Sequence, residues 1–306
     1  MVRLRLDLAY DGGAFYGWAR QPTLRTVQGE LEQALHTILR VSADDPDEPL
    51  RLTVAGRTDT GVHALHQVCH LDVGEATLER CVGHMGVPAP EALFRRLSRM
   101  VPDDIAIHAL SVAPEGFDAR FSALERTYVY RICDDARPVD PRMRGFVLAL
   151  DDRLDLDAMN AAAAMTIGLH DFGSFATPNP GGTTIREVKR AHWSRIPVSP
   201  LVPGASGGAG ISGGYTVPAA ESGLVCFTIV ADAFARNMVR SLVNACVKVG
   251  QGRKDLNWFA EKMATPLREG STGPIAPQGL TLEHVAYPAA DQLAARAEAI
   301  RAKRTL

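Results

Sequence analysis

Hydrophobic and polar positions alternate with two different periods along the first part of the chain. Apolar and charged residues alternate in VRLRLDLAYDG (residues 2–12), which is the period of a half-buried strand. Apolar residues in TVQGELEQALHTILRV (residues 26–41) recur instead at helical spacing, and Thr26 has the side chain of an N-cap. The same reasoning predicts strands over 50–56, 66–73 and 103–113, and a helix over 89–101.

The later part of the chain repeats this alternation of strands and helices. The pattern predicts strands over 117–135, 185–196 and 223–234, and helices over 155–168 and 235–252, the last ending at Gly250 or Gly252. The order of elements therefore predicts an α+β fold. It has two ferredoxin-like (RRM-like) halves with antiparallel sheets and helices on the outer faces.

Composition suggests where the domains begin and end. With 306 residues the chain has room for two domains. We expect an N-terminal domain over 1–116, a C-terminal domain over 117–288, and a solvent-facing helical tail over 289–306. A stretch rich in glycine, serine and proline interrupts the second domain near 197–222, and we expect a flexible surface insertion there.

Charge and cysteine content exclude several classes of protein. The five cysteines are scattered and form no CxxC pair, which favours reduced thiols and a cytoplasmic protein over a disulfide framework. No apolar run approaches the ~20 residues that span a bilayer, so we expect no membrane partner. The net charge of −2 gives no general affinity for nucleic acid, so such a partner would have to bind local basic patches.

The stretch VAGRTDTGVHALHQVCHLDV (residues 54–73) places three histidines, two glycines and Asp59 in or beside one polar loop. His63, His66 and His70 would line one face of a helix, but the sequence after Gly61 has the pattern of a strand. This pattern favours hydrogen-bonded or surface histidines over a zinc site, and no HExxH motif is present. We therefore predict no metal.

The glycines and the aspartate of this loop remain open to more than one interpretation. Gly56 and Gly61 form neither a dinucleotide fingerprint nor a P-loop, so we expect turns with positive φ at both. Asp59 lies two residues after Arg57. Taken alone, this spacing is more typical of a salt-bridged turn than of a catalytic carboxylate.

Six blocks of sequence change that balance. AGRTDTGVHALHQV resembles the signature of the tRNA pseudouridine synthase A family. The family's other blocks are matched in order by YDGGAFYGWARQ, FDARFSALERTYVYRI, HDFGSF, ADAFARNMVRSLVNACVKVGQGR and APQGL. Two departures stand out. Asn244 replaces an expected glycine in the late helix, and the glycine-rich excursion over 204–214 is long.

The resemblance implies isomerisation of uridine to pseudouridine at positions 38, 39 and 40 of the tRNA anticodon stem-loop. It implies no cofactor, and a homodimer whose two subunits both contact the tRNA. Asp59 would be the nucleophile at C1′ of a flipped-out uridine, and Arg240 its ion-pair partner. Tyr128 would stack on the uracil or help remove the C5 proton, with Tyr130 as its rival on the same strand face. Arg57 would assist base flipping, and its alternative is a salt bridge to Asp59.

Contacts with the RNA would require further polar and basic side chains. The candidates for substrate binding are Arg126, Arg131, Arg120, His63 and Gln21. Weaker candidates are Trp18, Arg95, Arg96, Arg99, Arg253 and Lys254. Two other functions remain as alternatives: a non-catalytic RNA-binding protein built from the same halves, and a metal-dependent hydrolase using the histidines at 63–70.

Overall fold

The computed structural model describes residues 1–42, 50–134, 139–178, 182–198, 219–267 and 269–301. Its strands are β1 (Val2–Tyr10), β2 (Thr53–Val54), β3 (His63–Val73), β4 (Ile105–Val112), β5 (Glu125–Cys133), β6 (Leu148–Ala149), β7 (Gly168–Asp171), β8 (Ile185–Arg195), β9 (Val225–Ala231) and β10 (Leu280–Ala286). Its α-helices are α1 (Val27–Leu39), α2 (Glu75–Arg80), α3 (Ala89–Met100), α4 (Leu156–Ala164), α5 (Met238–Gly250), α6 (Leu256–Ala264) and α7 (Leu293–Arg301).

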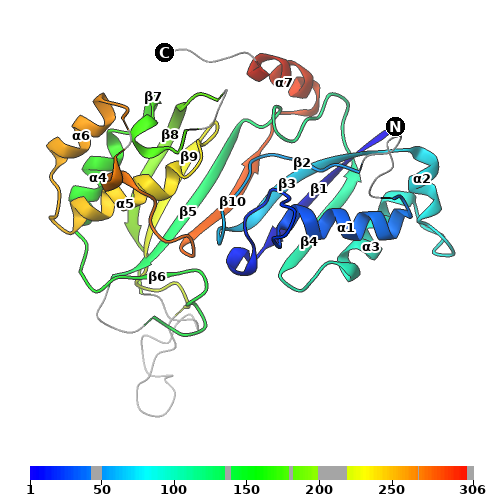
Figure 1. Cartoon of the computed structure of the whole chain (residues 1–306), viewed down its shortest axis with the longest axis horizontal. Helices are drawn as coiled ribbons and strands as arrows, with labels where there is room; N and C mark the ends of the chain where they lie inside the picture. The colour runs from blue at the N-terminus through cyan, green and yellow to red at the C-terminus, as the bar shows by residue number, and fades with distance from the viewer. Residues whose placement is uncertain (43–49, 135–138, 179–181, 199–218, 268, 302–306) are drawn as a thin grey trace, which may run out of the picture.

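All the strands belong to one mixed sheet, which confirms the predicted α+β class. The order along the sheet is β4-β1-β3-β10-β5-β9-β8-β7, with β2 paired to β3 and β6 to β5. The first half reads β4-β1-β3-β2 and the second reads β10-β5-β9-β8, so both have the strand order of a ferredoxin-like unit. Figure 1 shows α1–α3 beside the first half and α4–α6 beside the second, with β5 and β10 between them.

The two halves meet along a short stretch of parallel ladder. Thr281 and Leu282 of β10 pair with His63 and Ala64 of β3. Farther along β3, its partner is β2, which pairs with Cys69 and His70. The loop between β2 and β3 therefore emerges where the two halves join.

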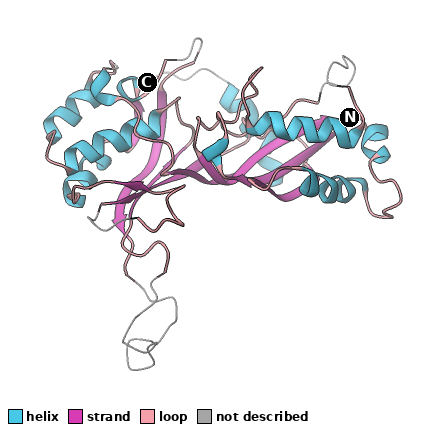
Figure 2. Ribbon diagram, turned by 60° about the horizontal axis from the view of Figure 1, so that its bottom comes forward, coloured by secondary structure: helices cyan, strands magenta, loops and turns pink. Residues whose placement is uncertain are grey.

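Alternation in the strands follows burial, as the sequence pattern predicts. Leu4, Leu6 and Leu8 of β1 are fully buried, whereas the intervening Arg3 and Asp7 lie on the other face, where they are partly exposed. Charges on that face pair within the sheet, because Arg3 binds Asp72 and Arg5 binds Asp7. Helices α1–α3 and α4–α6 form two groups toward opposite ends of the sheet, with most of the strands between them (Figure 2), and α7 lies apart from both groups (Figure 1).

Several predicted boundaries shift for identifiable reasons. Helix α5 begins at Met238 rather than 235 because Asn237 has φ 62°, a left-handed conformation that interrupts a helix, and it ends at Gly250 as expected. Strand β5 begins at Glu125 because the Asp118 carboxylate accepts hydrogen bonds from the backbone N–H groups of Arg120 and Phe121 and holds a turn.

The predicted helical tail forms as α7, but one of its faces packs against the protein instead of facing solvent. Leu293 and Ala297 of α7 are buried, and the Leu293 carbonyl accepts a hydrogen bond from Ser122. Helix α7 therefore packs on the turn that precedes β5. The elements that the pattern failed to predict are α2, α6, β6, β7 and β10.

The domain boundaries at 116 and 288 stay predictions, and most of the predicted insertion over 197–222 lies outside the described residues. None of the helices in the described part of the chain is long and apolar enough to cross a bilayer. The departure at Asn244 is accommodated, because its side-chain amide donates to the Gly273 carbonyl at 2.7 Å.

Candidate active site

Asp59 lies at the tip of the tight turn between β2 and β3. The Val62 N–H donates to the Asp59 carbonyl at 3.1 Å, and Gly61 has φ 76°, which only glycine adopts readily. This confirms the predicted role of Gly61. The same prediction is wrong for Gly56, because its φ is not positive, and a Cβ there would lie 3.9 Å from Arg126 Nε, an ordinary contact.

The glycine-rich loop that follows β1 holds this turn from outside. The Trp18 N–H donates to the Thr58 carbonyl at 3.1 Å, and the Gly61 N–H donates to the Phe15 carbonyl at 3.2 Å. Gly17 approaches so closely that a Cβ would lie 2.8 Å from the Thr58 oxygen. Thr58 also bonds the buried Tyr10 hydroxyl at 2.7 Å. The backbone that carries Asp59 is therefore fixed on both sides.

The Asp59 carboxylate faces the N-terminus of α5. The guanidinium groups of Arg240 and Arg236 and the backbone N–H of Asn237 lie near enough to lower its pKa. Burial is the largest influence and acts the other way, so the pKa of Asp59 is raised above its ordinary value. Anions are favoured at helix N-termini, so this arrangement holds a carboxylate in a partly desolvated position.

The ion pair predicted between Arg240 and Asp59 is not formed in the described structure, and Arg240 influences Asp59 through its charge. Its Nε donates to the Ile275 carbonyl at 2.7 Å, and among the described residues no hydrogen bond or ion pair joins it to Asp59. Burial lowers the pKa of Arg240 while Asp59 raises it. The carboxylate oxygens are thus left accessible to a third group.

Tyr128 and Tyr130 of β5 differ in whether the hydroxyl group forms a hydrogen bond. The Tyr130 ring is fully buried and its hydroxyl donates to the Ala276 carbonyl at 2.6 Å, which makes it part of the core. The Tyr128 ring packs edge-on against Phe234 with centroids 5.1 Å apart. Its hydroxyl has no hydrogen-bond partner among the residues the structure describes. Burial, Tyr10 and Asp59 all raise the pKa of Tyr128, so this phenol is neutral and lies close to the carboxylate.

Arg57 is exposed, and the structure does not form the salt bridge that its spacing from Asp59 suggested. In the parts of the chain that the structure describes, its guanidinium forms neither an ion pair nor a hydrogen bond. It stands beside the turn with its donors free.

Comparison with known proteins identifies what this arrangement belongs to. A family model described as tRNA pseudouridine synthase matches residues 162–288. The tRNA pseudouridine synthase A of Bifidobacterium longum strain DJO10A is 72% identical over 308 residues and covers 100% of both chains. That of Bifidobacterium animalis subsp. lactis is 68% identical over the full length of both, and that of Streptomyces griseus is 45% identical over 100% of this chain and 95% of its own.

The chain belongs to the tRNA pseudouridine synthase A family. Pseudouridine synthases are isomerases, so this membership makes the chain an enzyme of that class. Of the functions left open by the sequence, tRNA pseudouridine synthase activity is the one that the comparisons support.

The three histidines at positions 63, 66 and 70 serve the fold. His63 Nδ1 accepts from the Gly12 N–H at 3.0 Å, and its Nε2 bonds the Gly145 carbonyl at 3.0 Å. His66 bonds Asp7 at 2.9 Å, and His70 accepts from the Ala119 N–H at 3.0 Å. Each ring is bound to a different segment. The described residues contain no group of three or more side chains that could hold a metal ion.

The candidates for RNA contact fall into two groups. Arg126 is buried, and the described hydrogen bonds of its guanidinium go to backbone carbonyls, so its charge is not presented at the surface. Arg131 is bound by Glu221 and Glu283, and Trp18 is buried in the core. Arg120 is exposed, with its guanidinium over the Phe121 ring. Gln21 is exposed too, and its amide donates to the Tyr16 carbonyl at 3.0 Å.

The weaker basic candidates are exposed and lie on two helical surfaces. Arg95, Arg96 and Arg99 lie on α3, where Arg95 pairs with Glu91 and Arg96 donates to the Cys81 carbonyl. Arg253 and Lys254 follow α5, where Arg253 pairs with Asp152 and Lys254 lies over the Trp258 ring. Both surfaces therefore have their charges partly engaged within the chain.

Sequence reasoning missed two groups that contact or face Asp59. These are the backbone N–H of Asn237 and the side chain of Arg236, both in the ARN segment before α5. A signal was available, because a helix N-terminus attracts a carboxylate. What the sequence could not show is which carboxylate lies there.

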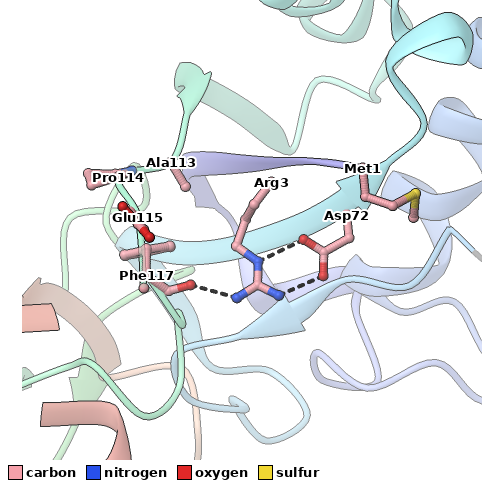
Figure 3. Close-up of a pocket in the computed structure, with 8 residues that line it drawn as sticks. Met1, Arg3, Asp72, Ala113, Pro114, Glu115 and Phe117 are labelled. Atoms are coloured by element: carbon pink, nitrogen blue, oxygen red, sulfur yellow. Dashed lines mark hydrogen bonds and ion pairs between the residues drawn. The ribbon is translucent and has the colours of Figure 1, made fainter. Parts of the chain in front are cut away.

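A surface pocket at the outer edge of the first half offers no comparable chemistry. Figure 3 shows Arg3 at its centre, with its guanidinium bound to Asp72 and to the Phe117 carbonyl. Arg3 and Asp72 satisfy each other in this pocket, which distinguishes it from the site around Asp59.

Proposed function

We propose that this enzyme converts uridine to pseudouridine at positions 38, 39 and 40 of the tRNA anticodon stem-loop, with Asp59 as the nucleophile. The observation that carries the proposal is the setting of the Asp59 carboxylate. It is partly buried, faces the Asn237 N–H and two guanidinium charges, and forms no direct ion pair with any residue that the structure describes.

The reaction needs a carboxylate near C1′ of the ribose. The N-glycosidic bond breaks as the Asp59 carboxylate bonds to C1′, the uracil turns, and C5 then displaces the carboxylate from C1′. The C5 proton leaves to solvent and N1 gains a proton, so atoms balance without an oxidant or reductant. Asp59 must be ionised to act. Arg240 and Arg236 oppose the effect of burial on its pKa and so favour the ionised form near neutral pH.

Tyr128 is placed to meet the uracil. Its ring forms a buried wall with Phe234, and its hydroxyl, unpartnered among the described residues, lies near Asp59. A neutral phenol in that position can pack against the flipped base and take part in moving the C5 proton.

Arg57 fits the task of base flipping. A uridine in a stem must leave the stack, at a cost of about a few kcal/mol, before its C1′ can reach a carboxylate. Arg57 is exposed beside the turn and free of Asp59, so its guanidinium can enter the space that the base vacates.

The rest of the tRNA interface would come from local basic surfaces in a homodimer in the cytoplasm. Arg120 is the best candidate of the second half because it is exposed and carries an adjacent aromatic ring. A dimer would collect such residues from two chains along one tRNA, which reconciles RNA binding with a net charge of −2 per chain.

The test uses anticodon-arm RNA labelled with tritium at uridine C5. The enzyme should release tritium to water at each of the three target positions, and Asp59→Asn should reduce the rate by about 10³-fold or more. Asp291→Asn, which removes an exposed carboxylate elsewhere, is the matched control and should keep the rate. Release by Asp59→Asn at the wild-type rate would refute the assignment. Salt-sensitive binding without any release would favour the RNA-binding alternative.

A further inference from the structure

Arg126 is a buried cation in the part of the molecule where the two halves meet. Its side chain is on β5, two residues before Tyr128, and only 7% of the residue is exposed. Among the described residues it has no carboxylate within ion-pairing distance. Burying a guanidinium without an anion is costly, and burial lowers the pKa of Arg126 accordingly. Such a residue calls for an explanation beyond packing.

The guanidinium is satisfied by three backbone carbonyls from three separate segments. Nη2 donates to the Ala55 carbonyl at 2.6 Å and to the Arg120 carbonyl at 2.9 Å, while Nη1 donates to the Asp232 carbonyl. A planar group with five donors can span acceptors in this way, whereas the ammonium of lysine cannot. The geometry therefore requires arginine.

Two of these carbonyls precede the groups that make up the proposed site. Ala55 comes four residues before Asp59, and Asp232 comes four residues before Arg236. The first belongs to the N-terminal half and the second to the C-terminal half. Arg126, on the strand that carries Tyr128, thus bonds the segment that leads to Asp59 and the segment that leads to Arg236.

The sheet itself contributes little to fixing the position of the Asp59 turn relative to the segment that carries Arg236 and Arg240. The ladder between β3 and β10 joins two residue pairs, Thr281 with His63 and Leu282 with Ala64. The spacing between Asp59 and the guanidinium groups of Arg236 and Arg240 consequently depends on contacts outside the ladder. The bond from Arg126 to the Ala55 carbonyl is such a contact, in the segment that leads into the turn.

We propose that Arg126 is a positioning residue that sets the placement of the Asp59 turn relative to the segment carrying Arg236 and Arg240. It acts through backbone carbonyls and does not touch the substrate. This inference rests on the proposed role of Asp59, and it deepens that role by naming what holds the carboxylate at its distance from the two guanidinium groups.

The experiment compares Arg126→Lys with Arg195→Lys. Arg195 is a partly buried arginine bound to Asp134. It pairs with Val225, the first residue of β9, whereas Asp232 follows the last residue of that strand. Single-turnover tritium release is measured from pH 5 to 9, together with tRNA affinity and the unfolding midpoint of each variant. Assays are run below the lower midpoint, so that both variants are folded.

Arg126→Lys should lower the rate about 10- to 100-fold and change tRNA affinity little, since displacement of a reacting group by ~1 Å can cost about 10²-fold. The acid limb of its pH–rate profile should move to higher pH. Asp59, faced by Arg236 and Arg240 from the α5 side and by Tyr128 from β5, would keep its burial and lose part of its compensating charge.

A loss of rate that is equal at every pH, or one no larger than that of Arg195→Lys, would overturn the inference, because a merely structural arginine would behave in that way. Arg126→Gln, which keeps two donors, repeats the test if the lysine variant does not fold, and the same two outcomes apply. Asp59→Asn separates the two proposals. If it stays active, the proposed function fails; if it is inactive and the acid limb of Arg126→Lys is unmoved, only the positioning role fails.

Discussion

Gly61 and Pro277 are 216 positions apart in the chain and pack directly against each other, since a Cβ at Gly61 would lie 2.7 Å from Pro277 Cγ. Pro277 leads into β10, and Gly61 ends the turn that carries Asp59. The contact therefore fixes the turn against the C-terminal half.

Gly61→Ala should strain the backbone and push the turn away from Pro277. Gly61 has φ 76°, and such strain costs about 1–3 kcal/mol in a residue with a side chain. We expect a comparable loss of unfolding free energy in a denaturant titration, together with a lower rate of tritium release. Gly56→Ala is the control, because a Cβ at that position would lie 3.9 Å from its nearest neighbour, Arg126 Nε. The unfolding free energy of this variant should stay within about 0.5 kcal/mol of wild type. Equal stability of the two variants would contradict this account.

Asp59→Asn should be at least as stable as wild type at pH 7.5 although it is inactive. Burial raises the pKa of Asp59 in the folded state, so the ionised carboxylate destabilises the fold once pH exceeds that value. Below the unfolded pKa of about 3.9 the group is protonated in both states and this cost is absent. Any stability gain of the variant should thus shrink as pH falls toward 4, as chemical denaturation at both pH values would show. A variant that is less stable than wild type at pH 7.5 would argue against a desolvated carboxylate.

Arg240→Gln should move the acid limb of the pH–rate profile to higher pH. The charge of Arg240 lowers the pKa of Asp59, so removing it raises that pKa and delays ionisation. Arg236→Gln removes a solvent-exposed charge that lowers the pKa of Asp59 less than Arg240 does. The acid limb of the pH–rate profile of this variant should therefore move less. A pH series of single-turnover rates distinguishes the two, and an unmoved limb in Arg240→Gln would remove it from the site.

Tyr128→Phe and Tyr130→Phe should separate catalysis from stability. The Tyr130 hydroxyl bonds the Ala276 carbonyl, so its loss should cost about 1–3 kcal/mol of unfolding free energy and little activity. The Tyr128 hydroxyl has no partner in the described part of the chain. Its removal should leave stability nearly unchanged and slow tritium release by about 10²-fold. Full activity of Tyr128→Phe, with loss in Tyr128→Leu, would restrict Tyr128 to stacking.

Local pattern accounts for much of the fold and little of the site. Period-two alternation in β1 and helical spacing in α1 report burial on one face, which a single sequence displays. Strand β10 was not predicted from the sequence. Its burial depends on its two neighbours in the sheet, β3 and β5, and both are distant from it in the chain. The predicted tail helix forms as α7, but the packing of one of its faces was missed for the same reason, since the surface it covers lies near Ser122.

The site shows the same division. Motif resemblance indicated Asp59, Tyr128 and Arg240, and the turn at Gly61 followed from local chemistry. The resemblance also suggested RNA contact for Arg126 and Arg131, but their partners come from other strands and leave neither guanidinium free. Whether an arginine is buried or available is decided by tertiary contacts.

The position of β10 in the sheet has a consequence for synthesis on the ribosome. Every other strand is made before it, yet it lies between β3 and β5 and is the strand through which the two halves share one sheet. Domains generally fold as they emerge, N-terminal first. The nascent chain must therefore hold two partly formed sheets with open edges until β10 emerges and closes both, so Asp59 and its two neighbouring arginines come together only once β10 has been made.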